Sequence, residues 1–155
     1  MPSSSTLELW DALADEAAAE SPLWRDALKP AHERERVAVF SMLAEPRFAL
    51  AIETIYEGYL VHYGRPRLFA PRDADKALLL GDYLYAHGLV RVAELGDVEA
   101  VRVLAELISL CAHLRADGVG GDGEAWAATA TGLGDGAHTD DELAQALAAH
   151  ADRVG

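Results

Sequence analysis

Aromatic, acidic and basic side chains gather in one stretch of this 155-residue sequence. From Tyr56 to Arg67, an apolar helical pattern ends and runs into a proline-rich segment. Guanidinium groups in such a place suit the paired oxygens of a carboxylate or a phosphate. The stretch therefore predicts a site for a small amphipathic or anionic ligand. Its candidate ligand-binding residues are Glu57, Tyr59, His62, Tyr63, Arg65 and Arg67.

The same residue types also fit a structural interpretation. Tyrosines at helical spacing can bury their rings in a core while their hydroxyl groups stay in contact with water. The arginines can pair with carboxylates of the chain itself, because 26 Asp and Glu residues stand against 13 Lys and Arg. Both interpretations stay open at this point.

A second candidate is Asp82, in the stretch 76–95. On a helix, the charged residues of this stretch form a narrow stripe, and apolar residues fill most of the remaining circumference. The pattern predicts a central helix that is covered on most sides. Asp82 falls within the apolar arc, where a carboxylate must be hydrogen-bonded, ion-paired or protonated. We expect a buried polar Asp82, paired with His87 or with a loop arginine; a catalytic base is the alternative.

Metal and nucleophile chemistry fit the sequence poorly. Glu53 and Glu57, with His62 nearby, could share a metal, but a dinuclear site in a helical bundle needs Glu-x-x-His motifs on other helices, and none occurs. Cys111 lies in an apolar helical row without a nearby electropositive group, and no G-x-S-x-G motif occurs. We therefore expect no metal ligand and no catalytic residue on this chain.

The composition restricts the class of protein. A chain of this length suits one core that buries roughly 70% of the unfolded surface. The net charge of −13 argues against binding to nucleic acid or to anionic lipid. The sequence has no run of about 18 apolar residues, and its first ten residues do not resemble a signal peptide. With a single cysteine and no disulfide partner, we expect a cytoplasmic protein.

Helical periodicity predicts an all-α fold with no strand. The first expected helix ends at residue 20. The others span residues 22–28, 32–45, 48–63, 76–95, 97–115, 124–131 and 139–153. Gly96-Asp97 predicts a sharp turn, and Thr139 with Glu142 predicts a capping box at the start of the last helix. We expect three parts: a helical bundle domain at 1–116, a Gly-rich flexible segment with a possible short helix at 117–138, and a C-terminal helix at 139–155.

Gly81 and Gly88 are seven residues apart and share one face of the expected helix 76–95. Without side chains, this face can admit another helix at close range. That helix can belong to a partner or to the same chain, and the spacing does not distinguish them. If a partner binds there, the candidate interface residues are Gly81, Leu84, Tyr85, Gly88, Leu89 and Val92.

Residues 48–117 resemble the trans-polyprenyl diphosphate synthases, an all-α family. Ala51-Ile52-Glu53 is similar to the family's A-I-E-x-I-H helix. The stretch from Ala77 to Ile108 is similar to its A-L-L-A-G-D-Y-L-x-A helix and the helix that follows, including the Gly-Asp turn between them. The resemblance implies a truncated bundle with an isoprenoid-synthase-like fold.

The chain departs from this family where the family's chemistry lies. Members hold magnesium ions on two aspartate clusters, and these ions stabilise the diphosphate leaving group. Where the first D-D-x-x-D motif is expected, this chain has Leu60-Val61-His62-Tyr63-Gly64, and Asp140-Asp141 lacks the third aspartate. Magnesium would therefore enter only through a catalytic partner.

The family includes two-component enzymes in which a short subunit without aspartate motifs accompanies a catalytic subunit. This chain is similar to the short subunit of hexaprenyl and heptaprenyl diphosphate synthases in size and in lacking the aspartate motifs. The resemblance implies a non-catalytic partner subunit in isoprenoid quinone side-chain biosynthesis that helps set product chain length. It also implies an interface built from the helices at 76–95 and 97–115. The alternatives are a stand-alone ligand-binding module and a homodimeric interaction domain.

Overall fold

The computed structural model describes residues 4–155, with side chains from Glu8 onward. Within this range the chain forms seven α-helices and no strand, which confirms the all-α prediction. The helices are α1 (Ser4–Glu20), α2 (Pro22–Ala27), α3 (Ala49–Tyr63), α4 (Ala74–Glu94), α5 (Val98–Ala116), α6 (Asp122–Gly132) and α7 (Asp140–Val154). Short 3₁₀ turns lie at Ala31–Glu33, Ser41–Leu43 and Pro46–Phe48.

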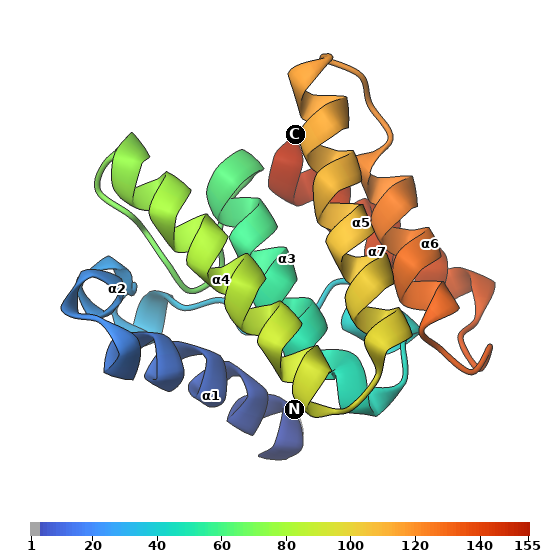
Figure 1. Ribbon diagram of the computed structural model, residues 1–155, viewed down its shortest axis with the longest axis horizontal. Helices are drawn as coiled ribbons and strands as arrows, with labels where there is room; N and C mark the ends of the chain where they lie inside the picture. Colours follow the sequence, from blue (N-terminus) through green and yellow to red (C-terminus); the bar gives the residue numbers. More distant parts are fainter. Residues whose placement is uncertain (1–3) are drawn as a thin grey trace.

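The central helix is α3. It runs antiparallel to α4, with α1 and α2 on one side of the pair and α5, α6 and α7 on the other (Figure 1). Every residue of α3 from Ala51 to Val61 is buried. By contrast α4 exposes Leu78, Leu79 and Val90, so the prediction of a central helix at 76–95 that is covered on most sides is wrong. The apolar arc of α4 is wider than the surface its neighbours cover.

Glycines bring α3 and α4 together. A β-carbon added at Gly81 would collide with the imidazole ring of His62, and one added at Gly88 would collide with Ile55. At Gly58 of α3 an added β-carbon would lie 2.9 Å from the carbonyl oxygen of Gly81. The face that Gly81 and Gly88 share is therefore packed against α3 of the same chain, which is the intramolecular alternative allowed by the sequence.

Most helix ends follow the capping patterns of the sequence. Asp97 accepts a hydrogen bond from the Ala100 amide at 2.9 Å and begins α5, after Gly96 turns the chain at a φ of 78°. Thr139 and Glu142 form the predicted capping box of α7.

The expected helix at 32–45 is absent. Residues 34–38 are extended, and a 3₁₀ turn follows at Ser41–Leu43. The cause lies far along the chain, because a carboxylate oxygen of Glu53 accepts the amide hydrogens of Val39 at 3.2 Å and Ser41 at 3.1 Å. Amides bound to this buried carboxylate cannot donate to a helical turn.

The expected division into three parts does not match the core. Residues 1–3 of the expected first domain lie outside the described range. The expected flexible segment at 117–138 contains α6, whose Trp126 is buried among Phe40, Tyr56 and Tyr59. Ala146 of α7 belongs to the same hydrophobic cluster as α3. The described C-terminal helices thus complete the core around α3, because the large indole side chain of Trp126 anchors α6 there.

Candidate functional site

Among the described residues, one polar cluster lies in the interior of the molecule and is centred on Arg67, and a second cluster reaches from the interior to the surface. The guanidinium of Arg67 donates from Nη1 to Glu53 at 2.6 Å and from Nε to Glu57 at 3.0 Å. The other carboxylate oxygen of Glu57 accepts from the amides of Arg67 and Leu68 at 3.0 and 2.8 Å. Glu53, Glu57 and Arg67 are fully buried. This cluster fastens the loop after α3 to two turns of the central helix.

The surroundings of Arg67 keep it charged. Burial by itself would lower its pKa, but the nearby carboxylates of Glu53 and Glu57 raise the pKa above its ordinary value. The guanidinium also lies over the ring of Trp10, 4.6 Å from its centroid. With its donors taken by the chain itself, Arg67 is not available to a ligand. The geometry therefore favours the structural interpretation for Glu57 and Arg67, and their role in ligand binding stays a prediction.

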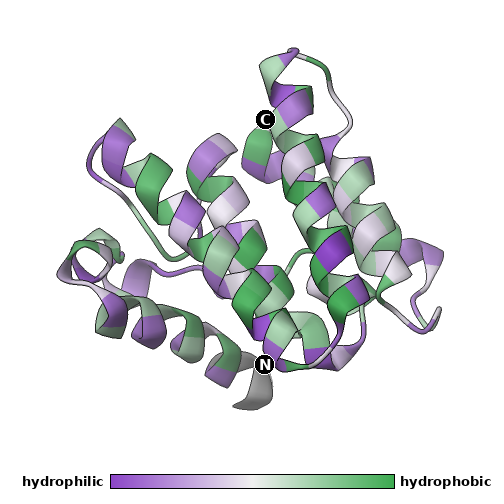
Figure 2. Cartoon of the chain, viewed as in Figure 1, coloured by the Kyte–Doolittle hydropathy of each residue, from purple (hydrophilic) through white to green (hydrophobic). Residues whose placement is uncertain are grey.

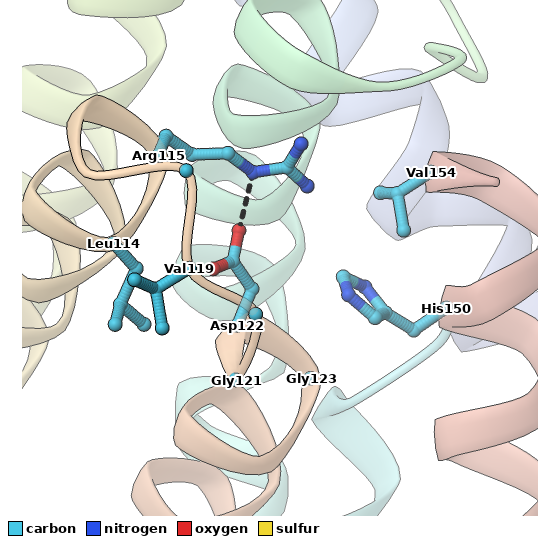
Figure 3. Close-up of a pocket in the computed structure, with 10 residues that line it drawn as sticks. Leu114, Arg115, Val119, Gly121, Asp122, Gly123, His150 and Val154 are labelled. Atoms are coloured by element: carbon cyan, nitrogen blue, oxygen red, sulfur yellow. Dashed lines mark hydrogen bonds and ion pairs between the residues drawn. The ribbon is translucent and has the colours of Figure 1, made fainter.

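The second polar cluster borders a cavity of about 420 Å³ between the Gly-rich turn before α6 and the last turns of α7 (Figure 3). Arg115 from the end of α5 and Asp122 from the start of α6 point toward one another, and His150 of α7 faces them from the opposite side. Gly123 makes room for the imidazole, since an added β-carbon would lie 2.9 Å from His150 Cδ2. The cavity joins three helices that are separated in the sequence.

Tyr59 forms the inner end of this cluster. Its hydroxyl donates to Asp122 Oδ2 at 2.5 Å, and the same oxygen accepts from Arg115 Nε at 2.7 Å. Arg115 also donates from Nη2 to the Tyr59 hydroxyl at 2.8 Å. Burial, together with the hydrogen bond to Asp122, raises the pKa of Tyr59. The phenol therefore keeps its proton and cannot act as a base near neutral pH.

His150 adds a neutral imidazole. Its Nδ1 lies 2.8 Å from the Tyr56 hydroxyl, in hydrogen-bond contact. Burial lowers the pKa of His150 below its ordinary value. The cavity wall thus combines one guanidinium, one carboxylate and one uncharged ring, and the two charges compensate each other. Such a wall can bind a small polar or anionic molecule through Arg115 but offers no activated nucleophile.

The remaining predicted ligand residues do not share this cavity. His62 packs its ring against Tyr85 and lies 3.1 Å from the carbonyl oxygen of Leu78. Tyr63 stacks at an angle on Tyr59, with its ring 5.2 Å from the Arg115 guanidinium. Arg65 donates to the carbonyl oxygen of Asp152 at 3.2 Å, at the surface. Of the predicted set, Tyr59 takes part in the hydrogen bonds of the cluster beside the cavity, and Tyr63 contacts that cluster through its ring.

The predicted buried Asp82 is also corrected. Its side chain is 62% exposed, with His62 Nε2 at 3.5 Å from Oδ1. Asp82 lies on the outward face of α4, which no described helix covers, so its charge stays solvated.

The six candidate interface residues face inward in this chain. The buried ones are Gly81, Leu84, Gly88 and Val92, while Tyr85 and Leu89 pack against the core. The helix α3 already occupies the face that a partner was expected to cover. The packing therefore favours a role of these residues within the fold, and their role in an interface stays a prediction.

Sequence reasoning missed Arg115, Asp122 and His150. Asp122 stands in the sequence DGVGGDG, whose composition favours a linker, and Arg115 ends a helix with a solvated stripe. A signal for His150 was present, because it follows Leu143, Ala146 and Leu147 at helical spacing. A histidine on the apolar face of a helix indicates a buried ring with a polar partner.

Comparison with known proteins gives one relative. The chain is 40% identical over 70 residues to heptaprenyl diphosphate synthase component 2 of Geobacillus stearothermophilus, a match that covers 39% of this chain and 22% of that protein. The chain thus spans about a fifth of the length of the relative it matches. No family model and no solved structure matches. The similarity supports a relationship to a prenyl diphosphate synthase component.

The described residues form neither a metal cluster nor a membrane-spanning helix. No group of three or more His, Cys, Asp or Glu side chains between residues 4 and 155 is arranged to hold a metal ion. Among the helices of the same range, none combines the length and the apolar character needed to cross a bilayer.

Proposed function

We propose that this chain is a non-catalytic partner subunit of a heteromeric long-chain trans-prenyl diphosphate synthase, acting in isoprenoid quinone side-chain biosynthesis. The single observation that carries the proposal is the similarity to heptaprenyl diphosphate synthase component 2. In this proposal the chain binds a catalytic subunit that has both aspartate motifs and helps set the length of the product.

The end of α3 supports a non-catalytic role. Where the family has its first aspartate motif, α7 closes the end of α3, and the Arg65 amide donates to the carbonyl oxygen of Arg153 at 2.9 Å. A β-carbon on Gly64 would lie 2.9 Å from that same oxygen. Residues 60–64 carry none of the aspartates of that motif. In this proposal the catalytic metal ions are held by the partner.

The outward face of α4 and the start of α5 are the proposed contact surface, in place of the glycine face. Hydrophobic residues recur along both helices in Figure 2. The exposed large ones are Leu78, Leu79, Val90, Leu95 and Val98, and Val98 is 81% exposed. Exposed apolar residues concentrated on neighbouring helices are typical of a surface that a partner covers.

Co-expression with a polyprenyl synthase that carries both aspartate motifs, from the same genome, tests the proposal. We expect a stoichiometric complex on size exclusion, no turnover by this chain alone, and a product length that differs between the complex and the catalytic subunit alone. Val90→Lys should prevent assembly without loss of helicity. Val37→Lys, at an equally exposed apolar position outside α4 and α5, is the matched control. A chain that stays free of every such synthase would refute the proposal.

The cavity beside Arg115 favours a second candidate function, a module that binds a small amphipathic or anionic ligand. Arg115 offers a cation at the rim of a space of about 420 Å³, next to the predicted ligand residue Tyr59. Inorganic phosphate and octyl phosphate are suitable probes in a thermal-shift titration. A rise in melting temperature that Arg115→Met abolishes would support this function. An equal rise in both proteins would show that the cavity is not the site.

A further inference from the structure

A groove of about 480 Å³ runs between α5 and α6, apart from both polar clusters. Its apolar lining comes from Val103, Leu107 and Leu110 of α5 and from Ala128 and Leu133 at the α6 side. Leu107 is buried and forms the floor, whereas Leu110 is 47% exposed. Gly132 at the end of α6 leaves open space, since no atom lies within 4 Å of an added β-carbon. The groove is thus deep enough to receive side chains and open to a partner.

Acidic residues border this apolar lining. Glu99 and Glu106 stand in the α5 wall, and Arg102 pairs with both of them. The border therefore carries more negative than positive charge.

The same imbalance extends over the C-terminal helices. Residues 94–155 hold twelve of the 26 Asp and Glu but only three of the 13 Lys and Arg. All three arginines are paired within the chain: Arg102 as above, Arg115 with Asp122, and Arg153 with Glu35. An apolar groove in so acidic a half of the molecule is complementary to an apolar helix face flanked by Lys and Arg.

We propose that the α5–α6 groove binds a basic amphipathic helix of the partner subunit, with apolar side chains at i, i+3, i+4 and i+7 in the groove and Lys or Arg against its acidic border. The identity of the partner rests on the proposed function; the chemistry of the occupant rests on the groove itself. A second copy of this chain is a poor occupant, because its own C-terminal helices carry the same negative charge.

A synthetic peptide of about 15 residues tests this inference directly. It contains Leu at the groove-facing positions and Lys at the flanking ones. Two matched peptides accompany it: a scrambled one with the same composition but no apolar face, and one with Glu in place of every Lys. Binding is followed by the chemical shifts of the backbone amides of the intact protein. We expect saturable shifts on α5 and α6 with the first peptide only, and weaker binding as salt rises.

Two variants with matched controls locate the binding site. Gly132→Phe fills the groove with an aromatic ring and adds no charge; Gly120→Phe places the same ring at another open glycine outside it. Leu110→Lys adds a positive charge in the groove, and Val37→Lys adds one at an equally exposed apolar position outside it. We expect each groove variant to lower the affinity for the Leu-Lys peptide at least tenfold. Each control should change this affinity less than twofold.

Equal binding of the scrambled peptide would overturn the inference, because attraction between opposite charges would then explain the binding without an apolar helix face. Shifts confined to α4, or groove variants that bind like their controls, would also overturn it. The result is separable from that of the co-expression experiment. If the peptide binds but no complex with a synthase forms, the groove is supported as a helix-binding site and the proposed partner is refuted. If a complex forms and Gly132→Phe does not weaken it, the groove is refuted as the contact site and the proposed partner stands.

Discussion

Arg67 and Glu53 form an ion pair 2.6 Å long in which neither side chain is exposed to solvent. The pair joins the loop after α3 to the centre of that helix, and Glu57 completes it from one turn further along. Because Glu53 also binds two amides of the segment before α3, one carboxylate holds three parts of the chain in place.

Arg67→Met should destabilise the protein by about 3–5 kcal/mol, because two buried carboxylates lose their cation. Urea denaturation followed by circular dichroism measures the change. Adding Glu53→Gln and Glu57→Gln to Arg67→Met should recover part of the loss, since no buried charge then remains. If the triple variant is less stable than the single one, the hydrogen bonds of the carboxylates matter more than charge balance.

Gly88→Ala should destabilise the fold by about 1–3 kcal/mol, because the new methyl group collides with Ile55 and cannot move away from the carbonyl oxygen of Ala51. Gly132→Ala is the matched control, since its methyl group meets nothing within 4 Å. We expect the control to be neutral or more stable by up to about 1 kcal/mol. Thermal unfolding of both variants, side by side, decides the matter. Equal stabilities would show that α3 and α4 can separate without cost.

Stability should fall as the pH drops below about 6.5, the ordinary pKa of histidine. Burial lowers the pKa of His150 in the folded chain, so this imidazole becomes protonated at a higher pH in the unfolded chain than in the folded one. The unfolded state then holds more protons below pH 6.5, and the free energy of unfolding decreases until the folded pKa is also passed. His150→Phe should remove this part of the pH dependence, which denaturant titrations from pH 8 to 5 would measure. His113→Gln, at an exposed position of α5, should keep it.

Cys111 should be unreactive in the folded protein. Burial is the main cause that raises the pKa of its thiol, to about 12, so almost no thiolate is present at pH 8. Absorbance after addition of a disulfide reagent should stay flat under native conditions and rise by one equivalent in denaturant. Fast reaction of the native protein would mean that α5 opens from the core far more often than its packing implies.

Much of the fold could be predicted from local patterns. Periodicity located α3, α4 and α5, and the caps at Asp97 and Thr139 began the helices where the structure begins them. The helix expected at 32–45 failed because its amides bind Glu53, a contact that no local pattern contains. Asp82 was misplaced for a related reason. The width of an apolar arc does not tell which part of it other helices will cover.

The site could be predicted only in part. Tyr59 was a candidate, but its partners Asp122 and Arg115 lie more than fifty residues away and come together only when α5 and α6 pack on α3. Composition misled at Asp122, since glycines that suggest a linker instead form a tight entry to α6. The sequence made Arg67 a candidate partner of either a ligand or a carboxylate, and its burial, which no local pattern contains, favours the carboxylate.

The close approach of α3 and α4 at Gly58 and Gly81 also bears on recognition. Because the two backbones approach so closely there, we expect the helices to resist sliding and tilting, and the outward face of α4 to keep its shape whether or not it is covered. Binding of a protein to this face then costs little conformational entropy, because α4 is already ordered, and shape complementarity alone can provide the affinity. The same rigidity would make this face selective, because a partner of different curvature could not be accommodated by adjustment of α4.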